Sequence, residues 1–147
     1  MLRTLNYSVA KLTVGQLWIV FCCNSTKDKT VSDSIMLEKA KDFAVNLINI
    51  CNRIKDRKKE SILTVQLIRS GTSIGANIHE SKYAQSSADF VSKMQIALKE
   101  CYESEYWLEL LNRTGYLENE QYKKILNDCG QIRRMLISSI NTVKENS

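Results

Sequence analysis

The side chains that could act as metal ligands or nucleophiles are five cysteines and a single histidine, His79. A zinc site needs several cysteine or histidine ligands at fixed spacing, and a ferritin-like di-iron site needs two Glu-x-x-His motifs. The chain has no Cys-x-x-Cys pair and no second histidine, so neither site can be assembled. The same shortage leaves no credible Ser-His-Asp or Cys-His arrangement for covalent catalysis. We therefore expect no metal, cofactor, catalytic residue or small-molecule substrate.

Residues 71–75, Gly-Thr-Ser-Ile-Gly, do not form a phosphate-binding loop. Such a loop ends in Lys-Ser or Lys-Thr and joins a strand to a helix, whereas this segment lies in the middle of a predicted helix. Each glycine costs about 1 kcal/mol relative to alanine in a helix interior. We therefore expect a packing reason for Gly71 and Gly75, namely the close approach of a neighbouring helix.

Hydrophobic periodicity predicts four helices, over about 33–56, 60–82, 87–112 and 119–144. The chain of 147 residues has no proline and only five glycines, which disfavours a β-sandwich or barrel because those folds need many tight turns. Short connections make successive helices antiparallel. The predicted fold is all-α, an up-down-up-down antiparallel four-helix bundle over residues 32–147.

Residues 1–31 are expected to form an N-terminal extension outside the bundle, flexible and dispensable for folding, with Ser32 or Asp33 capping the first helix. The chain carries a net charge of +5, of which residues 1–30 hold +3 through four cations and one anion. The bundle is therefore nearly balanced in charge, and its net charge gives only weak support for nucleic-acid binding.

The cysteines are predicted to be reduced thiols of a cytoplasmic protein. Cys51, Cys101 and Cys129 fall on the apolar stripes of their helices, where a thiol is buried and inert. No apolar run approaches the length of a transmembrane helix, and the apolar residues 17–23 lack a signal-peptide cleavage site. We expect neither secretion nor membrane insertion.

Basic residues gather at the end of the bundle where the first and third connections meet. We expect any affinity for nucleic acid to reside there and on the outer face, because Lys and Arg neutralise phosphates. An alternative is that this charge run is simply a solvated surface. Neither Trp107 nor any tyrosine interleaves with the run, so no base-stacking platform is expected. The predicted nucleic-acid-binding residues are Arg53, Lys55, Arg57, Lys58, Lys59, Lys123, Lys124 and Arg134.

Apolar residues also occur on helix faces that are not needed for the core stripes. Contiguous apolar patches on several helices mark association sites, so we expect a homo-oligomer, with a head-to-tail ring at least as natural as a two-fold dimer. The alternative is that wide stripes fill a thick core. The predicted interface residues are Ile62, Val65, Ala76, Ile96, Trp107 and Leu110, while Leu37, Val45 and Ile48 flank the stripe of the first helix.

Glu105 is the one acidic residue predicted near the middle of an apolar stripe, in register with Met94, Cys101 and Leu108. A carboxylate there is costly unless it is paired or hydrogen-bonded. Either that end of the helix opens to water, or Glu105 makes a polar contact inside the bundle, for which Tyr122 is a candidate. A catalytic role is the third and least favoured alternative.

Two long segments resemble the signatures of a known family. Residues 67–80, LIRSGTSIGANIHE, are similar to its second-helix signature, and residues 99–111, KECYESEYWLELL, to its third-helix signature. Residues 114–117 match the turn that follows. The family is the bacterial four-helix bundle family first met in proteins encoded within intervening sequences of large-subunit ribosomal RNA. The resemblance covers about residues 32–145 and implies the same bundle.

That family is similar to the accessory protein of diversity-generating retroelements, a basic homopentameric barrel that associates with nucleic acid and with a reverse transcriptase. The resemblance therefore implies a homopentamer, with RNA or a reverse transcriptase as partner. We expect a non-enzymatic oligomeric scaffold or adaptor. The alternative is a structural protein–protein interaction module with no role in nucleic-acid binding.

Overall fold

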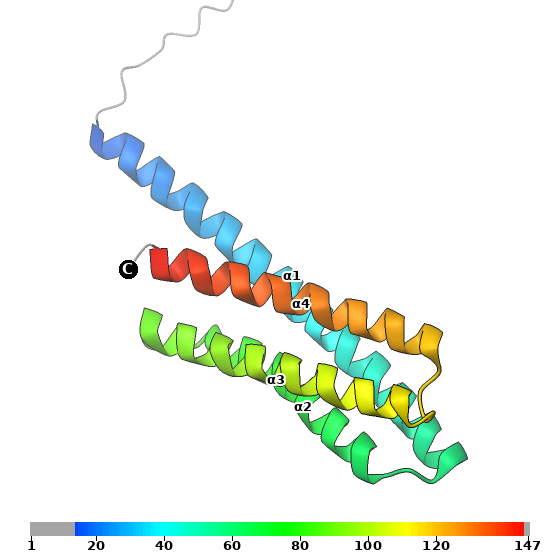
Figure 1. Ribbon diagram of the computed structural model, residues 1–147. Helices are drawn as coiled ribbons and strands as arrows, with labels where there is room; N and C mark the ends of the chain where they lie inside the picture. The colour runs from blue at the N-terminus through cyan, green and yellow to red at the C-terminus, as the bar shows by residue number, and fades with distance from the viewer. Residues whose placement is uncertain (1–13, 146–147) are drawn as a thin grey trace, which may run out of the picture. The chain divides into compact units, whose positions relative to one another are not determined.

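The computed structural model describes the backbone of residues 14–145 and the side chains of residues 34–145. Four helices make up nearly all of this part of the chain (Figure 1): α1 (Val14–Lys58), α2 (Ile62–Ser81), α3 (Ser87–Arg113) and α4 (Asn119–Glu145). Successive helices run in opposite directions, and no strand occurs among the described residues. The predicted all-α antiparallel four-helix bundle is confirmed.

The chain divides into two compact units, Met1–Asp33 and Ser34–Ser147, and α1 contributes residues to both. The predicted cap at Ser32 or Asp33 is wrong, because α1 begins at Val14 and is continuous through both residues. Side chains of these types cap a helix only where it starts. Residues 1–13 of the predicted extension lie outside the described residues, and its dispensability for folding stays a prediction.

The core of the Ser34–Ser147 unit is built from one apolar stripe on each helix. The stripes predicted from periodicity are confirmed by side chains that are almost completely buried: Phe43 and Leu47 on α1, Leu67, Ile74 and Ile78 on α2, Met94 and Leu108 on α3, and Ile132 and Leu136 on α4. Leu37 was expected to flank the stripe of α1, and this prediction is wrong. Leu37 is only 5% exposed, so the buried face of α1 is wide enough to hold it beside Met36.

A polar contact lies at the centre of the packing between α2 and α3. The Ser104 hydroxyl donates a hydrogen bond to the Ser70 hydroxyl at 2.9 Å, and the Ser70 hydroxyl donates to the Leu67 carbonyl at 3.3 Å. Both serines are completely buried. Because every hydroxyl finds a partner, the two small side chains let the helices approach without leaving an unpaired buried polar group.

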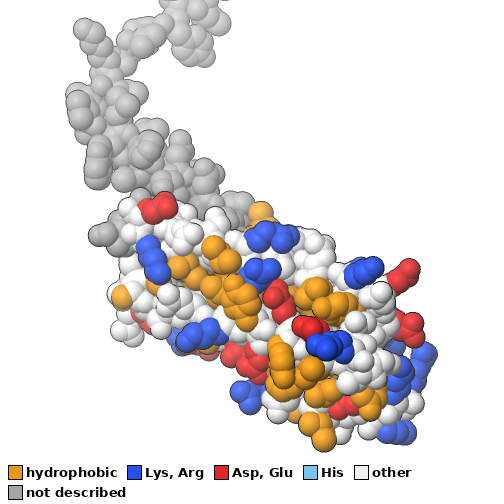
Figure 2. All heavy atoms as spheres, viewed as in Figure 1, with side chains coloured by type: hydrophobic (Ala, Val, Ile, Leu, Met, Phe, Trp, Pro, Cys, Tyr) orange, Lys and Arg blue, Asp and Glu red, His pale blue; other side chains and the backbone are white. Residues whose placement is uncertain are grey.

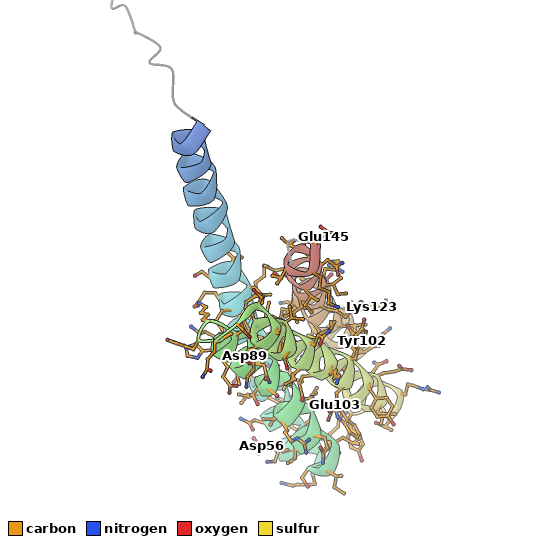
Figure 3. All side chains as sticks on the ribbon, turned by 90° about the vertical axis from the view of Figure 1, so that its left-hand side faces the viewer. Asp56, Asp89, Tyr102, Glu103, Lys123 and Glu145 are labelled. Carbon is orange, nitrogen blue, oxygen red and sulfur yellow. The ribbon has the colours of Figure 1, made fainter. Side chains whose placement is uncertain are left out.

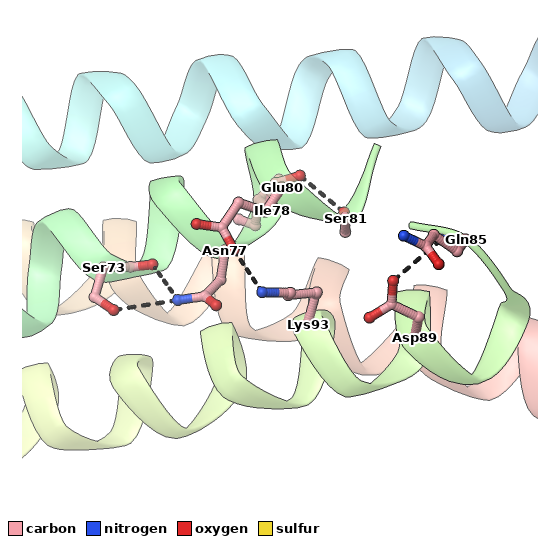
Figure 4. Close-up of polar contacts among 8 residues, drawn as sticks. All are labelled: Ser73, Asn77, Ile78, Glu80, Ser81, Gln85, Asp89 and Lys93. Carbon is pink, nitrogen blue, oxygen red and sulfur yellow. Dashed lines mark hydrogen bonds and ion pairs between the residues drawn. The ribbon is translucent and has the colours of Figure 1, made fainter. Parts of the chain in front are cut away.

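The connection between α2 and α3 is fixed by side chains at the start of α3 (Figure 4). The Ser86 hydroxyl accepts a hydrogen bond of 3.1 Å from the Asp89 amide. The Asp89 carboxylate accepts one of 3.1 Å from the Gln85 amide, as Figure 4 shows. Such reciprocal bonds satisfy amides that have no partner within the helix. Lys93 on α3 forms an ion pair of 2.6 Å with Glu80 on α2.

The two glycines of α2 face α1 at different separations. A Cβ atom added to Gly71 would lie 2.7 Å from Leu47 Cδ1 and 3.4 Å from Phe43 Cε1, both on buried side chains. A Cβ atom on Gly75 would meet Ala40 Cβ at 3.7 Å, which is an ordinary contact. The predicted packing reason therefore exists at Gly71 and is absent at Gly75.

Gly71→Ala and Gly75→Ala form a matched pair for stability measurements. Gly75→Ala should raise the free energy of unfolding by about 1 kcal/mol, since alanine is the better helix former. Gly71→Ala makes the same gain but displaces Leu47, and overpacking of this kind costs about 1–3 kcal/mol. We expect a net loss in urea denaturation. Equal gains for both variants would contradict the packing argument.

The three cysteines of the bundle should be inert towards thiol reagents in the folded protein. Burial raises the pKa of Cys51 to about 12. Contact with Cys129 and burial raise the pKa of Cys101. In a C22S/C23S variant, we expect negligible modification at pH 8 and modification of all three thiols once guanidinium unfolds the chain. Rapid reaction of the native protein would place a thiol at the surface.

Candidate nucleic-acid interface

Three adjoining cavities form a groove between the C-terminal part of α1 and α4, which we call the α1–α4 groove. The middle cavity has a volume of about 270 Å³ and the flanking ones about 200 and 220 Å³. The middle cavity shares Ile50, Arg53 and Gln121 with one neighbour and Asn46 and Asp128 with the other. The shared walls show that the three cavities are sections of one depression.

Half of the predicted nucleic-acid-binding residues line this groove. Arg53 and Lys124 line the middle section, and Arg53, Arg57 and Lys58 line the section next to the end of α1. The structure does not bring the other four predicted cations into the groove: Lys55 is partly buried, whereas Lys59, Lys123 and Arg134 are exposed. Figure 3 shows Lys123 on α4.

Three of the groove cations are available to a ligand. Within residues 34–145, Arg53, Arg57 and Lys124 make no ion pair. Lys58 is already engaged, since its ammonium donates a hydrogen bond of 2.5 Å to the carbonyl of Gly115 in the turn between α3 and α4. The groove also contains carboxylates, Asp42, Glu118 and Asp128, which reduce its positive potential.

An aromatic side chain lies among these cations, contrary to the sequence-based expectation. Tyr116 lines the same section of the groove as Arg53, Arg57 and Lys58, and it is half-buried against the core. The expectation that no tyrosine accompanies the basic residues is therefore wrong. It failed because Tyr116 follows α3 in the chain and reaches the end of α1 only through the antiparallel folding of the bundle.

The groove has further polar and apolar side chains that were not among the predicted site residues. Asn46, Asn49 and Gln121 line its middle section together with Ile50 and Ile125. A signal for the α1 side was present, because Asn46, Asn49 and Arg53 recur at steps of three and four residues and so share a helix face. The α4 side can be assigned only once the pairing of α1 with α4 is known.

The partner of Glu105 is Arg133 on α4, so the candidate Tyr122 is wrong. The Arg133 Nε donates a hydrogen bond of 2.9 Å to Glu105, and the guanidinium lies 5.4 Å from the ring centre of Tyr102. The hydrogen bond to Glu105 raises the pKa of Arg133. Ser104, rather than Glu105, occupies the centre of the α3 stripe, and Glu105 lies at its edge with 21% of its side chain exposed.

The predicted oligomer-interface residues differ in exposure. On α2, Ile62 and Val65 are 76% and 51% exposed, and Ala76 is also exposed. On α3, Ile96 is 37% exposed, whereas Trp107 and Leu110 are partly buried. Figure 2 shows apolar side chains scattered over the face formed by α3 and α4, with Lys and Arg gathered at the end that holds the α3–α4 turn. The interface stays a prediction, since a single chain is described.

The described residues offer neither a metal site nor a membrane-spanning helix. Among the described residues, no three His, Cys, Asp or Glu side chains are grouped so that they could hold a metal ion. None of the helices, searched over those residues, combines the length and the apolar character needed to cross a membrane.

Comparisons with known proteins agree with the bundle and its signatures. A family profile described as "23S rRNA-intervening sequence protein" matches residues 32–138. A crystal structure of a protein of unknown function from the S23 ribosomal protein family of Bacteroides thetaiotaomicron is 49% identical, with a TM-score of 0.74 over 75% of this chain and 98% of that one. No curated protein matches the chain. The chain belongs to the 23S rRNA-intervening sequence protein family.

Proposed function

We propose that this protein is a non-enzymatic homo-oligomeric adaptor of the cytoplasm that binds RNA through the α1–α4 groove. The observation that carries the proposal is the presence of Arg53, Arg57 and Lys124 in one groove, all without an ion pair among the described residues. Guanidinium and ammonium groups in a shared depression are the usual ligands of phosphate oxygens. The family name connects relatives of this chain with intervening sequences of 23S ribosomal RNA.

The charge balance of the groove sets the strength that we expect for this binding. Asp42, Glu118 and Asp128 offset part of its positive charge. A single copy should therefore make only a few phosphate contacts, and its affinity for RNA should fall as salt displaces them. Sequence preference should be small, because phosphate contacts carry no base information.

Self-association is the second part of the proposal. The exposed apolar residues of α2 are Ile62 and Val65 in its first turns and Ala76 further along the same face, beyond Arg69, and we call this face the apolar strip. The family resemblance favours a homopentamer. A reverse transcriptase is a further partner of such an adaptor that the family resemblance implies. The same strip also supports the alternative function, a structural protein–protein interaction module with no role in nucleic-acid binding.

Neutralising the free groove cations tests the RNA-binding proposal. The variant R53Q/R57Q/K124Q should bind single-stranded RNA more weakly than the parent. The slope of log affinity against log salt should fall by about 0.7 for each lost phosphate contact. Fluorescence anisotropy over a salt series measures both. The variant K82Q/K99Q/K144Q removes the same charge at exposed positions outside the groove and should change the slope little. Equal loss in the two variants would indicate only a general charge effect.

Light scattering of the purified protein tests self-association. We expect the parent to have a mass five times that of the chain. Val65→Glu should give a smaller species with unchanged helix content, because it places a carboxylate in the apolar strip. Tyr83→Glu is the matched control, since Tyr83 is 75% exposed beyond the end of α2 and is not among the apolar residues from which the oligomer is predicted. A monomeric parent at micromolar concentration would refute the oligomer.

A further inference from the structure

We propose that the α1–α4 groove binds unpaired RNA rather than duplex, with Tyr116 as the surface on which a base stacks. This inference rests on the proposed function and specifies which form of RNA the groove accepts. It is carried by three features of the groove: the aromatic ring among the cations, the unpartnered amide side chains and the apolar side chain of Ile50 in the same section.

Hydrogen bonds hold the backbone on both sides of Tyr116, and its side chain packs partly buried against the core. On the preceding side, the Gly115 carbonyl accepts the hydrogen bond from Lys58 of α1. On the following side, the Leu117 amide donates to the Leu111 carbonyl at 2.9 Å, and the Leu117 carbonyl accepts from the Asn112 side chain at 3.0 Å. A side chain that already packs against the core loses less conformational entropy when a base stacks on it than a free one does.

The ring also lies where a stacked nucleotide would place its phosphate near cations. Tyr116, Arg53, Arg57 and Lys58 line one section of the groove. Stacking of a base on an aromatic side chain beside a basic groove is the general mode by which proteins hold single strands. A duplex keeps its bases stacked on one another, so it could use the cations but not the ring.

The middle section of the groove offers hydrogen-bonding groups suited to base edges. Asn46, Asn49 and Gln121 line it, and their amides make no side-chain hydrogen bond within residues 34–145. Each amide presents both a donor and an acceptor, as the edges of bases do. Ile50 lines the same section and is only partly buried, so it can provide apolar contact for a base, whereas Ile125 is 2% exposed and belongs to the core beneath.

The length of the groove fits several nucleotides rather than one. Its α1 side runs from Lys39 to Lys58, which at about 1.5 Å per residue corresponds to about 28 Å. An extended acidic peptide could satisfy the cations over this length, but its Asp and Glu side chains have no aromatic ring to stack on Tyr116. The chemistry of the whole groove therefore favours a strand of unpaired nucleotides.

The test compares labelled oligoadenylate, labelled oligouridylate and the duplex that the two form, by fluorescence anisotropy. Tyr116→Leu keeps the apolar contact with the core and removes the ring. It should weaken binding of the single strands by about fivefold or more and leave binding of the duplex and the salt slope unchanged. Tyr116→Phe keeps the ring and should bind as the parent does. Tyr83→Leu, at an exposed tyrosine beyond the end of α2, is the matched control.

Asn49→Ala is a second variant whose result does not depend on the stability of the α3–α4 turn, because Asn49 is exposed on α1. It too should weaken single-strand binding and spare the duplex. If the duplex binds as tightly as the single strands and neither Tyr116→Leu nor Asn49→Ala has an effect, the inference is overturned while RNA binding through the cations stands. If polyglutamate displaces the strands as well as unlabelled RNA does, the groove is a general anion site. If no RNA binds, both proposals fail.

Discussion

The bundle depends on how closely α2 approaches its neighbours. Gly71 leaves only enough room for the Leu47 side chain of α1, and on the α3 side the Ser70–Ser104 hydrogen bond occupies the centre of the contact. A larger side chain at any of these positions would separate the helices and lose the contacts of every core residue around it. The inward face of α2 is thereby committed to packing. Its outward face, with Ile62 and Val65, stays exposed among the residues that the structure describes.

The sequence predicted the helices and most of the core, because an apolar stripe at helical spacing is a local pattern that tertiary contacts reinforce. The errors lie at the edges of stripes and at one helix start. Ser104 and Glu105 differ by about 100° around the helix, and only the positions of α2 and α4 decide which of them is central. Ser32 and Asp33 have the side chains of a helix cap, but no glycine or proline interrupts the helix there, so α1 continues through them.

The candidate site could be predicted only in part for a related reason. Arg53 and Arg57 lie four residues apart on one helix, so the sequence alone places them on a shared face. Lys124 and Tyr116 join them through the pairing of α4 and the α3–α4 turn with α1, which is a contact between distant parts of the chain. Charge counting also treats all cations alike, whereas the structure separates Lys58, which is bonded to Gly115, from Arg53 and Arg57, which make no ion pair among the described residues.

The two surfaces that carry the proposals use different side chains. The exposed apolar strip lies on α2, and no α2 residue lines the α1–α4 groove. Association through the strip would therefore leave the groove residues of each copy uncommitted. This separation matters for the affinity for RNA. The three carboxylates of the groove repel phosphates, so one groove should hold an RNA strand only weakly by itself. Several grooves on one assembly would meet the same strand at a high effective concentration, so that modest contacts add up to tight binding. In such an assembly the nearly balanced charge of each bundle ceases to argue against a role in RNA binding.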